Sequence, residues 1–163
     1  METIDIINKV FKFKISEHSS IKNDTLEAID RMGKYSYVNK GQQISNTDWH
    51  LPENFRRPYL DITMPILERY YSKLELVPDN IWFQQYYKND YHDWHRHGIC
   101  SYSSVYFLEL PNQNIKTEFE NLEIEVEEGD FIIFPGICLH RSPMNITTDR
   151  KTSIVVNLNQ PDY

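Results

Sequence analysis

Three of the six histidines have a spacing that could support metal chemistry: His95 and His97, two residues apart, and the later His140. Residues i and i+2 of an extended segment lie on the same face, so the first two imidazoles can point towards one place. Imidazole is a common ligand for transition metals. The pair alone is weak evidence, because two histidines on a polar strand also occur by chance.

The third histidine strengthens the prediction. His140 follows residues 129–135, where a glycine turn begins an apolar run and a proline ends it. Such a strand would deliver His140 to one mouth of a β-scaffold. We therefore predict that His95, His97 and His140 bind one metal ion. The alternative for His140 is a solvent-exposed loop histidine, which is what we expect for His92.

The elements that would position these histidines are mostly strands. From residue 81 onward, short runs rich in β-branched and aromatic residues predict strands. They cover residues 81–87, 103–108, 118–120, 122–126, 131–134 and 152–158. Turn residues separate them, as in Pro111-Asn112-Gln113-Asn114. This pattern favours a mainly β sandwich or small barrel of the jelly-roll type.

The N-terminal half has a different pattern. Alternation over residues 10–15 predicts a strand, and apolar spacing predicts helices over residues 18–32 and 59–74 on the outside of the β-structure. Pro65 should start, kink or divide the second helix. We expect residues 35–57 to form a loop, with a brief edge strand at residues 44–46.

Length and composition limit the function classes. The 163 residues suit one domain, with an N-terminal region over 1–80 and a β core over 81–159. The net charge of −7 argues against a broad grip on nucleic acid. No apolar run approaches the ~18 residues of a membrane span, and the acidic start Met1-Glu2-Thr3-Ile4-Asp5 does not resemble a secretory signal, so we expect a cytoplasmic protein. The two cysteines, Cys100 and Cys138, are expected to be structural thiols.

Taken in order, these segments resemble the Fe(II)/2-oxoglutarate-dependent oxygenases, in particular the compact versions common in bacteriophages and marine bacteria. The resemblance covers residues 81 to 159 and depends on residues 91–97, 104–108, 129–135, 140–145 and 149–157. It implies a double-stranded β-helix, which is the jelly-roll architecture, with His95, His97 and His140 as ligands of Fe(II). The family's usual motif is His-x-Asp/Glu…His, and here His97 occupies the carboxylate position. Asp93, two residues before His95, is a reserve ligand or an acceptor that orients a histidine ring.

The resemblance also implies a basic residue for the distal carboxylate of 2-oxoglutarate. Arg150, ten residues after His140, together with Thr152 resembles the family's Arg-x-Ser/Thr element. Lys151 with Ser153 is the same pattern shifted by one residue, so the register stays open. Neighbours on a strand point to opposite faces, and only one of the two basic residues can enter the barrel. We predict that Arg150 does.

The implied function is a dioxygenase of the hydroxylase type, an oxidoreductase that uses Fe(II), 2-oxoglutarate and O₂ on a small molecule or peptide. One alternative is a cupin-type metalloprotein whose three histidines hold iron or zinc without 2-oxoglutarate. Another is a non-catalytic β-barrel binding module whose histidines are incidental. If the three imidazoles converge on one point, the protein is one of the two metal-binding alternatives. If they do not, it is the non-catalytic binding module.

Overall fold

A computed structural model describes residues 9–161 of the chain. The N-terminal segment that argued against a secretory signal lies outside these residues. The strands of the first half are β1 (Phe11–Lys14), β2 (Tyr37–Asn39), β3 (Gln42–Ile44), β4 (Asn46–Thr47), β5 (Val77–Tyr86) and β6 (Tyr91–His95). Those of the second half are β7 (Tyr102–Glu109), β8 (Glu118–Phe119), β9 (Asp130–Pro135), β10 (His140–Ser142) and β11 (Lys151–Asn159). The helices are α1 (His18–Arg31), α2 (Tyr59–Lys73) and a short 3₁₀ helix, Gln113–Ile115.

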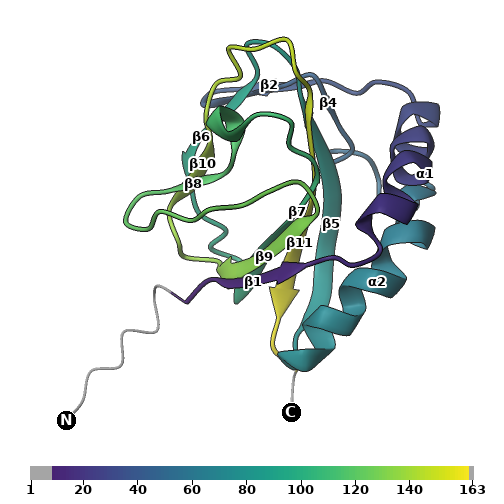
Figure 1. The fold of residues 1–163 in the computed structure, drawn as a ribbon, viewed down its shortest axis with the longest axis vertical. Coiled ribbons are helices and arrows are strands. Elements are labelled where there is room, and N and C mark those ends of the chain that lie inside the picture. Colours follow the sequence, from purple (N-terminus) through teal and green to yellow (C-terminus); the bar gives the residue numbers. More distant parts are fainter. Residues whose placement is uncertain (1–8, 162–163) are drawn as a thin grey trace.

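The strands form two antiparallel sheets. The large sheet has the order β1-β9-β7-β11-β5-β4, and the small sheet has the order β2-β3-β6-β10-β8. Both helices lie on one side of the large sheet, and β6, β8 and β10 lie on its other side (Figure 1). The predicted jelly-roll architecture is confirmed. The sandwich is open, however, because each sheet ends in edge strands, so it is not a closed barrel.

Strand β11 at the centre of the large sheet separates two cores. Ile154, Val156 and Leu158 face the helices and pack with their buried residues, whereas Val155 faces the small sheet. This alternation follows from the two-residue period of a strand. The side chains of β11 that accompany Val155 therefore point into the space between the sheets, where the histidines lie.

The two predicted helices are confirmed to within about one residue at each end. Helix α2 continues through Pro65, which is exposed on the face away from the sheet. Thr63, Met64 and Leu67 bury the opposite face. No helix within residues 9–161 is long and apolar enough to cross a membrane.

Two local predictions were wrong. Residues 35–57 are not a simple loop, because β2, β3 and β4 occur there and β3 pairs with β6, the strand that carries His95. Residues 122–126 do not form a strand, although Val126 is buried. In that segment lysine side chains bind the backbone carbonyls: Lys12 Nζ donates to Glu125 O and Lys116 Nζ donates to Ile124 O, both at 2.9 Å.

Candidate metal centre

The three predicted ligands lie together between the sheets. One ligand nitrogen from each of His95, His97 and His140 lies within 4.8 Å of the others. His95 and His140 are partners across the β6–β10 pair, with ring centroids 4.2 Å apart. The ring of His97 is 5.3 Å from the first and 5.1 Å from the second. The three rings are therefore grouped closely enough to form a candidate site for one metal ion.

Each of the three rings uses Nδ1 to donate a hydrogen bond to an oxygen. His95 donates to the carbonyl of Asp93 at 2.7 Å, and His140 donates to the carbonyl of Cys138 at 2.9 Å. His97 Nδ1 contacts Asn157 Oδ1 at 2.7 Å. Because these oxygens only accept, the proton sits on Nδ1 and the lone pair is left on Nε2. This is the arrangement in which a second hydrogen bond fixes the tautomer of a metal-binding histidine.

Burial keeps the rings neutral. It lowers the pKa of His95 to about 4, the pKa of His97 below its ordinary value and the pKa of His140 well below that value. In His95 and His140 the neighbouring imidazoles lower the pKa further. Neutral imidazole is the form that binds metal, so the donor set fits a divalent transition metal at neutral pH.

The loop after β6 carries His97 and is fixed by Gly136 at the end of β9. His97 N donates to Gly136 O at 2.8 Å, and Gly136 N donates to Ser101 O at 3.0 Å. A Cβ atom at Gly136 would lie 2.5 Å from Cys100 O and 2.6 Å from His97 O. Only glycine lets the two backbone segments approach this closely.

His92 was predicted to be an exposed loop residue, and that prediction was wrong. Its ring stacks on His95, with centroids 3.6 Å apart and planes at 7°. His92 and His95 are three residues apart but face the same way because β6 has a bulge. Across the β6–β10 pair, His95 pairs with His140 and His92 pairs with Ser142. Burial lowers the pKa of His92 to about 3. No sequence pattern marks this bulge, so the residue could not be found from spacing.

Asp93 does not join the metal ligands. It is exposed, and its side chain lies against Gly41. It nevertheless orients a histidine ring, through its backbone carbonyl rather than through its carboxylate.

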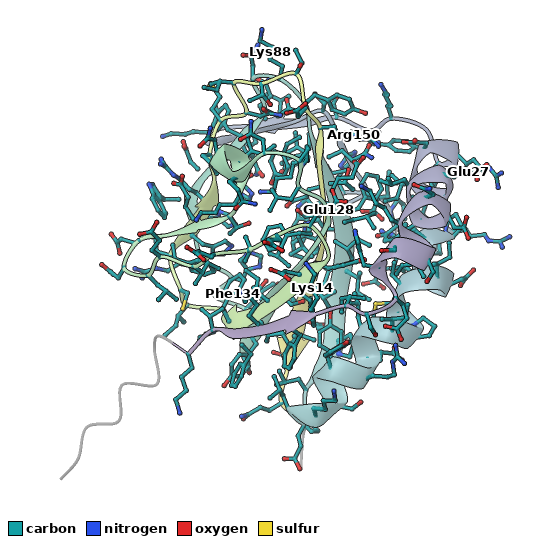
Figure 2. All side chains as sticks on the ribbon, in the orientation of Figure 1. Lys14, Glu27, Lys88, Glu128, Phe134 and Arg150 are labelled. Atoms are coloured by element: carbon teal, nitrogen blue, oxygen red, sulfur yellow. The ribbon has the colours of Figure 1, made fainter. Side chains whose placement is uncertain are left out.

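Arg150 and Lys151, at the N-terminal end of β11, point to opposite faces of the sheet, as expected. However, Lys151 rather than Arg150 faces the space between the two sheets. Arg150 binds Glu109 through Nε at 2.7 Å and Nη2 at 3.0 Å, and lies 3.5 Å from Asp30 of α1. Thr152 donates to the same glutamate. Figure 2 shows Arg150 on the α1 side of the large sheet and Phe134 on the side of the small sheet. The prediction that Arg150 points into the barrel is therefore wrong, because its guanidinium is used to join a helix to the sheet.

Lys151 takes the inward position. It is 1% exposed, and its ammonium donates to Ser142 Oγ at 2.9 Å and lies 5.1 Å from the ring centre of Tyr86. Burial lowers its pKa to about 7. Ser153, on the same face, is 2% exposed, and its hydroxyl has no hydrogen-bond partner among the described residues. A buried cation beside an unpartnered hydroxyl fits an anionic ligand.

These side chains line a small inner cavity of about 30 Å³, together with the histidines. His92, His95, His97 and Trp82 also line a wider outer cavity of about 370 Å³. The outer cavity extends to residues that the sequence did not single out, among them Tyr37, Gln42, Trp49 and Arg96. The two cavities share His92, His95, His97, Trp82 and Gln84 as lining residues, and Lys151 lines only the inner one.

Comparison with known proteins identifies the fold. No family model and no curated protein matches the chain. Among solved structures, a viral collagen prolyl hydroxylase from Paramecium bursaria Chlorella virus-1 matches 93% of this chain and 96% of its own, with a TM-score of 0.68 and 12% identity. An oxidoreductase of the 2OG-Fe(II) oxygenase family from Burkholderia pseudomallei matches 93% of this chain and 86% of its own, with a TM-score of 0.72 and 10% identity.

A prolyl-4-hydroxylase from Pseudomonas putida matches over 94% of this chain and 93% of its own, with a TM-score of 0.65 and 13% identity. At these identities the similarity establishes the fold. The chain has the double-stranded β-helix of these oxygenases, and the resemblance read from the sequence is confirmed at the level of the fold.

Proposed function

We propose that the chain is an Fe(II)- and 2-oxoglutarate-dependent oxygenase. One observation carries the proposal: His95, His97 and His140 lie together in a cavity that a buried lysine and an unpartnered hydroxyl also line. A metal ion and a dicarboxylate are the two groups that such an arrangement can hold side by side. The fold of the structural neighbours supports the same assignment.

His95, His97 and His140 would hold the metal, and Lys151 would hold the distal carboxylate of 2-oxoglutarate. A lysine ammonium pairs with a carboxylate as a point charge, and Ser153 can add a hydroxyl donor. The inner cavity of about 30 Å³ has room for the end of a small anion, so the rest of the cosubstrate would lie towards the histidines. The lysine and serine pair of the shifted register thus replaces Arg150 and Thr152 in this role.

When bound, the metal and 2-oxoglutarate would supply the oxidation of a C–H bond by O₂, with succinate and CO₂ as co-products. The chain's own part is to orient these groups and to exclude water. Trp82 stacks on His97 at 5.8 Å, and Phe134 contacts His140 edge to face at 4.8 Å. These buried rings hold two of the imidazoles in place and keep that side of the centre dry.

A second candidate, a metalloprotein that does not use 2-oxoglutarate, is favoured by the donor set itself. With His97 in place of a carboxylate, three neutral ligands leave the full charge of a divalent ion uncompensated. Three histidines with an open position also suit Zn²⁺ as a hydrolytic centre. Lys151 and Ser153 favour the oxygenase over the hydrolytic centre, because a hydrolytic centre does not require a buried anion site beside the metal.

The test is succinate formation from 2-oxoglutarate by purified protein loaded with Fe(II) in the presence of O₂. We expect slow turnover even without a substrate, and no turnover with Zn²⁺ or with His140→Ala. Stoichiometric Zn²⁺ retention with no binding of 2-oxoglutarate to the Fe(II) form would instead support the second candidate.

A further inference from the structure

The side-chain amide of Asn157 is held in one orientation. Its Oδ1 accepts the hydrogen bond from His97 Nδ1, at 2.7 Å. When Nε2 of His97 binds a metal, the proton of this ring is on Nδ1, so the end of Asn157 that meets the ring must be its oxygen. The NH₂ group of Asn157 is therefore turned away from His97.

The nitrogen of this amide is an unused donor. Asn157 is 1% exposed, and its Nδ2 makes no hydrogen bond within residues 9–161. In the same part of the chain, the fully enclosed side-chain atoms without a partner are the hydroxyls of Ser103 and Ser153, so the Asn157 nitrogen is not sealed inside the protein. Since Asn157 lines the outer cavity, its NH₂ group opens into that cavity, beside a metal ligand. A buried donor of this kind favours a ligand that supplies an acceptor.

Gln84 offers a second donor of the same kind. Its Oε1 accepts from Tyr86 Oη at 3.0 Å, and its Nε2 has no hydrogen-bond partner among the described residues. Gln84 lines both cavities, whereas Tyr86 lines only the inner one. The oxygen is therefore held towards the inner cavity, and the nitrogen is the end left for a ligand in the outer cavity.

Two tryptophans form an aromatic wall of the same cavity. Trp49 contacts Trp82 with ring centroids 4.4 Å apart, and Trp82 stacks on His97. Trp49 lines the cavity and is 40% exposed, so part of its indole ring is left for a ligand. The preceding residue, Asp48, is fully buried and accepts from Phe83 N at 2.8 Å, which anchors the segment that carries Trp49. Flat rings pack well on such a fixed aromatic surface.

We propose that the outer cavity binds a small flat molecule that carries a carbonyl oxygen, with its ring against Trp49 and Trp82. The carbonyl oxygen accepts from the amides of Asn157 and Gln84. This inference rests on the proposed function in one respect, since it makes the occupant the substrate of the metal centre. A volume of about 370 Å³ lies within the range of small-molecule pockets, roughly 300–1,000 Å³. The two amides select an acceptor over an ammonium group, for which no Asp or Glu of the described residues lines this cavity.

The amide groups themselves provide a direct readout. In ¹⁵N-labelled protein loaded with diamagnetic Zn²⁺, each side-chain NH₂ gives a pair of resonances, and no turnover occurs. The loss of one pair in Asn157→Asp and of another in Gln84→Glu assigns them. Acetophenone, 1-phenylethylamine and ethylbenzene share a ring and differ in the group beside it, which is a carbonyl acceptor, an ammonium donor or neither. Cyclohexyl methyl ketone keeps the carbonyl on a ring that is not flat.

We expect acetophenone to shift both amide pairs saturably and to bind at least about fivefold more tightly than each of the other three compounds. Gln84→Glu keeps the acceptor for Tyr86 Oη but replaces the donor by a carboxylate. It should weaken acetophenone about fivefold and strengthen 1-phenylethylamine, so that the amine becomes the tighter ligand. Trp49→Ala should weaken acetophenone about fivefold. Trp94→Ala is the matched control and should change no affinity, because Trp94 is exposed to a similar degree, 41%, but lines neither cavity.

Equal affinity for ethylbenzene, shifts that leave both amide pairs in place, or an unchanged order of affinities in Gln84→Glu would overturn the inference. Tighter binding of a prolyl peptide than of acetophenone would overturn it as well. These outcomes do not depend on succinate formation. The binding experiment and the oxygenase proposal can therefore fail separately.

Discussion

At the scale of single residues, the metal centre depends on which nitrogen of each ring carries the proton. Two of the acceptors that fix this choice are backbone carbonyls, which no substitution removes. The third is the side chain of Asn157, which is 1% exposed and accepts from His97. Of the three acceptors, Asn157 is therefore the one at which a substitution can alter the tautomer of a histidine without replacing the histidine itself.

Asn157→Leu should weaken metal binding about 10- to 100-fold, because His97 loses the acceptor that orients its ring. The measurement is competition for Zn²⁺ against a chromophoric chelator. Asn157→Asp keeps an acceptor at the same position and is the control, with affinity equal to or above that of the unmodified protein. Equal weakening by both substitutions would assign Asn157 a packing role only.

Lys151→Met should reduce the affinity of the metal-loaded protein for 2-oxoglutarate by roughly 30-fold or more, because a buried charge partner is lost. Arg150→Gln, at the neighbouring position, should change that affinity by less than about twofold, since its guanidinium binds Glu109 on the other face. Calorimetric titration of 2-oxoglutarate measures both. The reverse order of effects would return the anion site to Arg150 and Thr152.

The sequence contained enough information to choose Lys151 over Arg150 as the residue that faces the histidines. Ile154, Val156 and Leu158 share one face of β11, and Ser153 and Asn157 share the other. The polar face is the one that lies towards the histidines. Lys151 is two residues before Ser153 and therefore belongs to this face. The position of His92, in contrast, depends on a bulge that no alternation reveals.

At the scale of elements, the histidines are placed by contacts between strands and loops that are distant in sequence. Apolar periodicity predicted both helices and the strands β1, β5, β7, β8, β9 and β11 to within a few residues. The strands β2, β6 and β10 were not predicted, and β3 and β4 were predicted only as one brief strand at residues 44–46. Pairing rather than local composition stabilises the short ones: β2 pairs with β3, β3 with β6, and β4 with β5. Residues 122–126 have strand composition, but lysine side chains occupy their carbonyls.

Gly136→Ala tests the contact between the end of β9 and the loop that carries His97. Its Cβ would clash with two backbone carbonyls, so the loop must move. We expect metal affinity to fall at least about tenfold, since small displacements of a positioned ligand are costly. Gly98→Ala in the same loop is the control, because a Cβ there has no atom within 4 Å. If the two variants bound metal equally well, Gly136 would not position His97.

At the scale of the whole molecule, four imidazoles link stability to pH: His140 is buried, and His92, His95 and His97 are half-buried. Burial lowers the pKa of His92 to about 3 and that of His95 to about 4, and lowers those of His97 and His140 as well. In the unfolded chain these rings take up protons below about pH 6.5, whereas the folded protein does not. Proton uptake therefore lowers the free energy of the unfolded state relative to the native state as the pH falls through this range, and the folded protein becomes less stable.

The free energy of unfolding of the metal-free protein should accordingly be greatest above about pH 6.5. Between pH 7 and pH 5 it should fall by about 2 kcal/mol for each ring whose folded pKa lies below 5. Urea denaturation at a series of pH values measures it, and saturating Zn²⁺ should reduce the loss near neutral pH because the metal competes with protons. A free energy of unfolding that stayed constant down to pH 5 would contradict the neutral state of these rings in the folded protein.

The most direct measurement of the central claim is an anaerobic calorimetric titration of 2-oxoglutarate into the Fe(II)-loaded protein. If three histidines and Lys151 form one site for metal and cosubstrate, one equivalent of 2-oxoglutarate should bind per Fe(II), and binding should be lost both in the metal-free protein and in His140→Ala. Binding of 2-oxoglutarate that is equally strong without metal, or no binding to the fully Fe(II)-loaded protein, would contradict it.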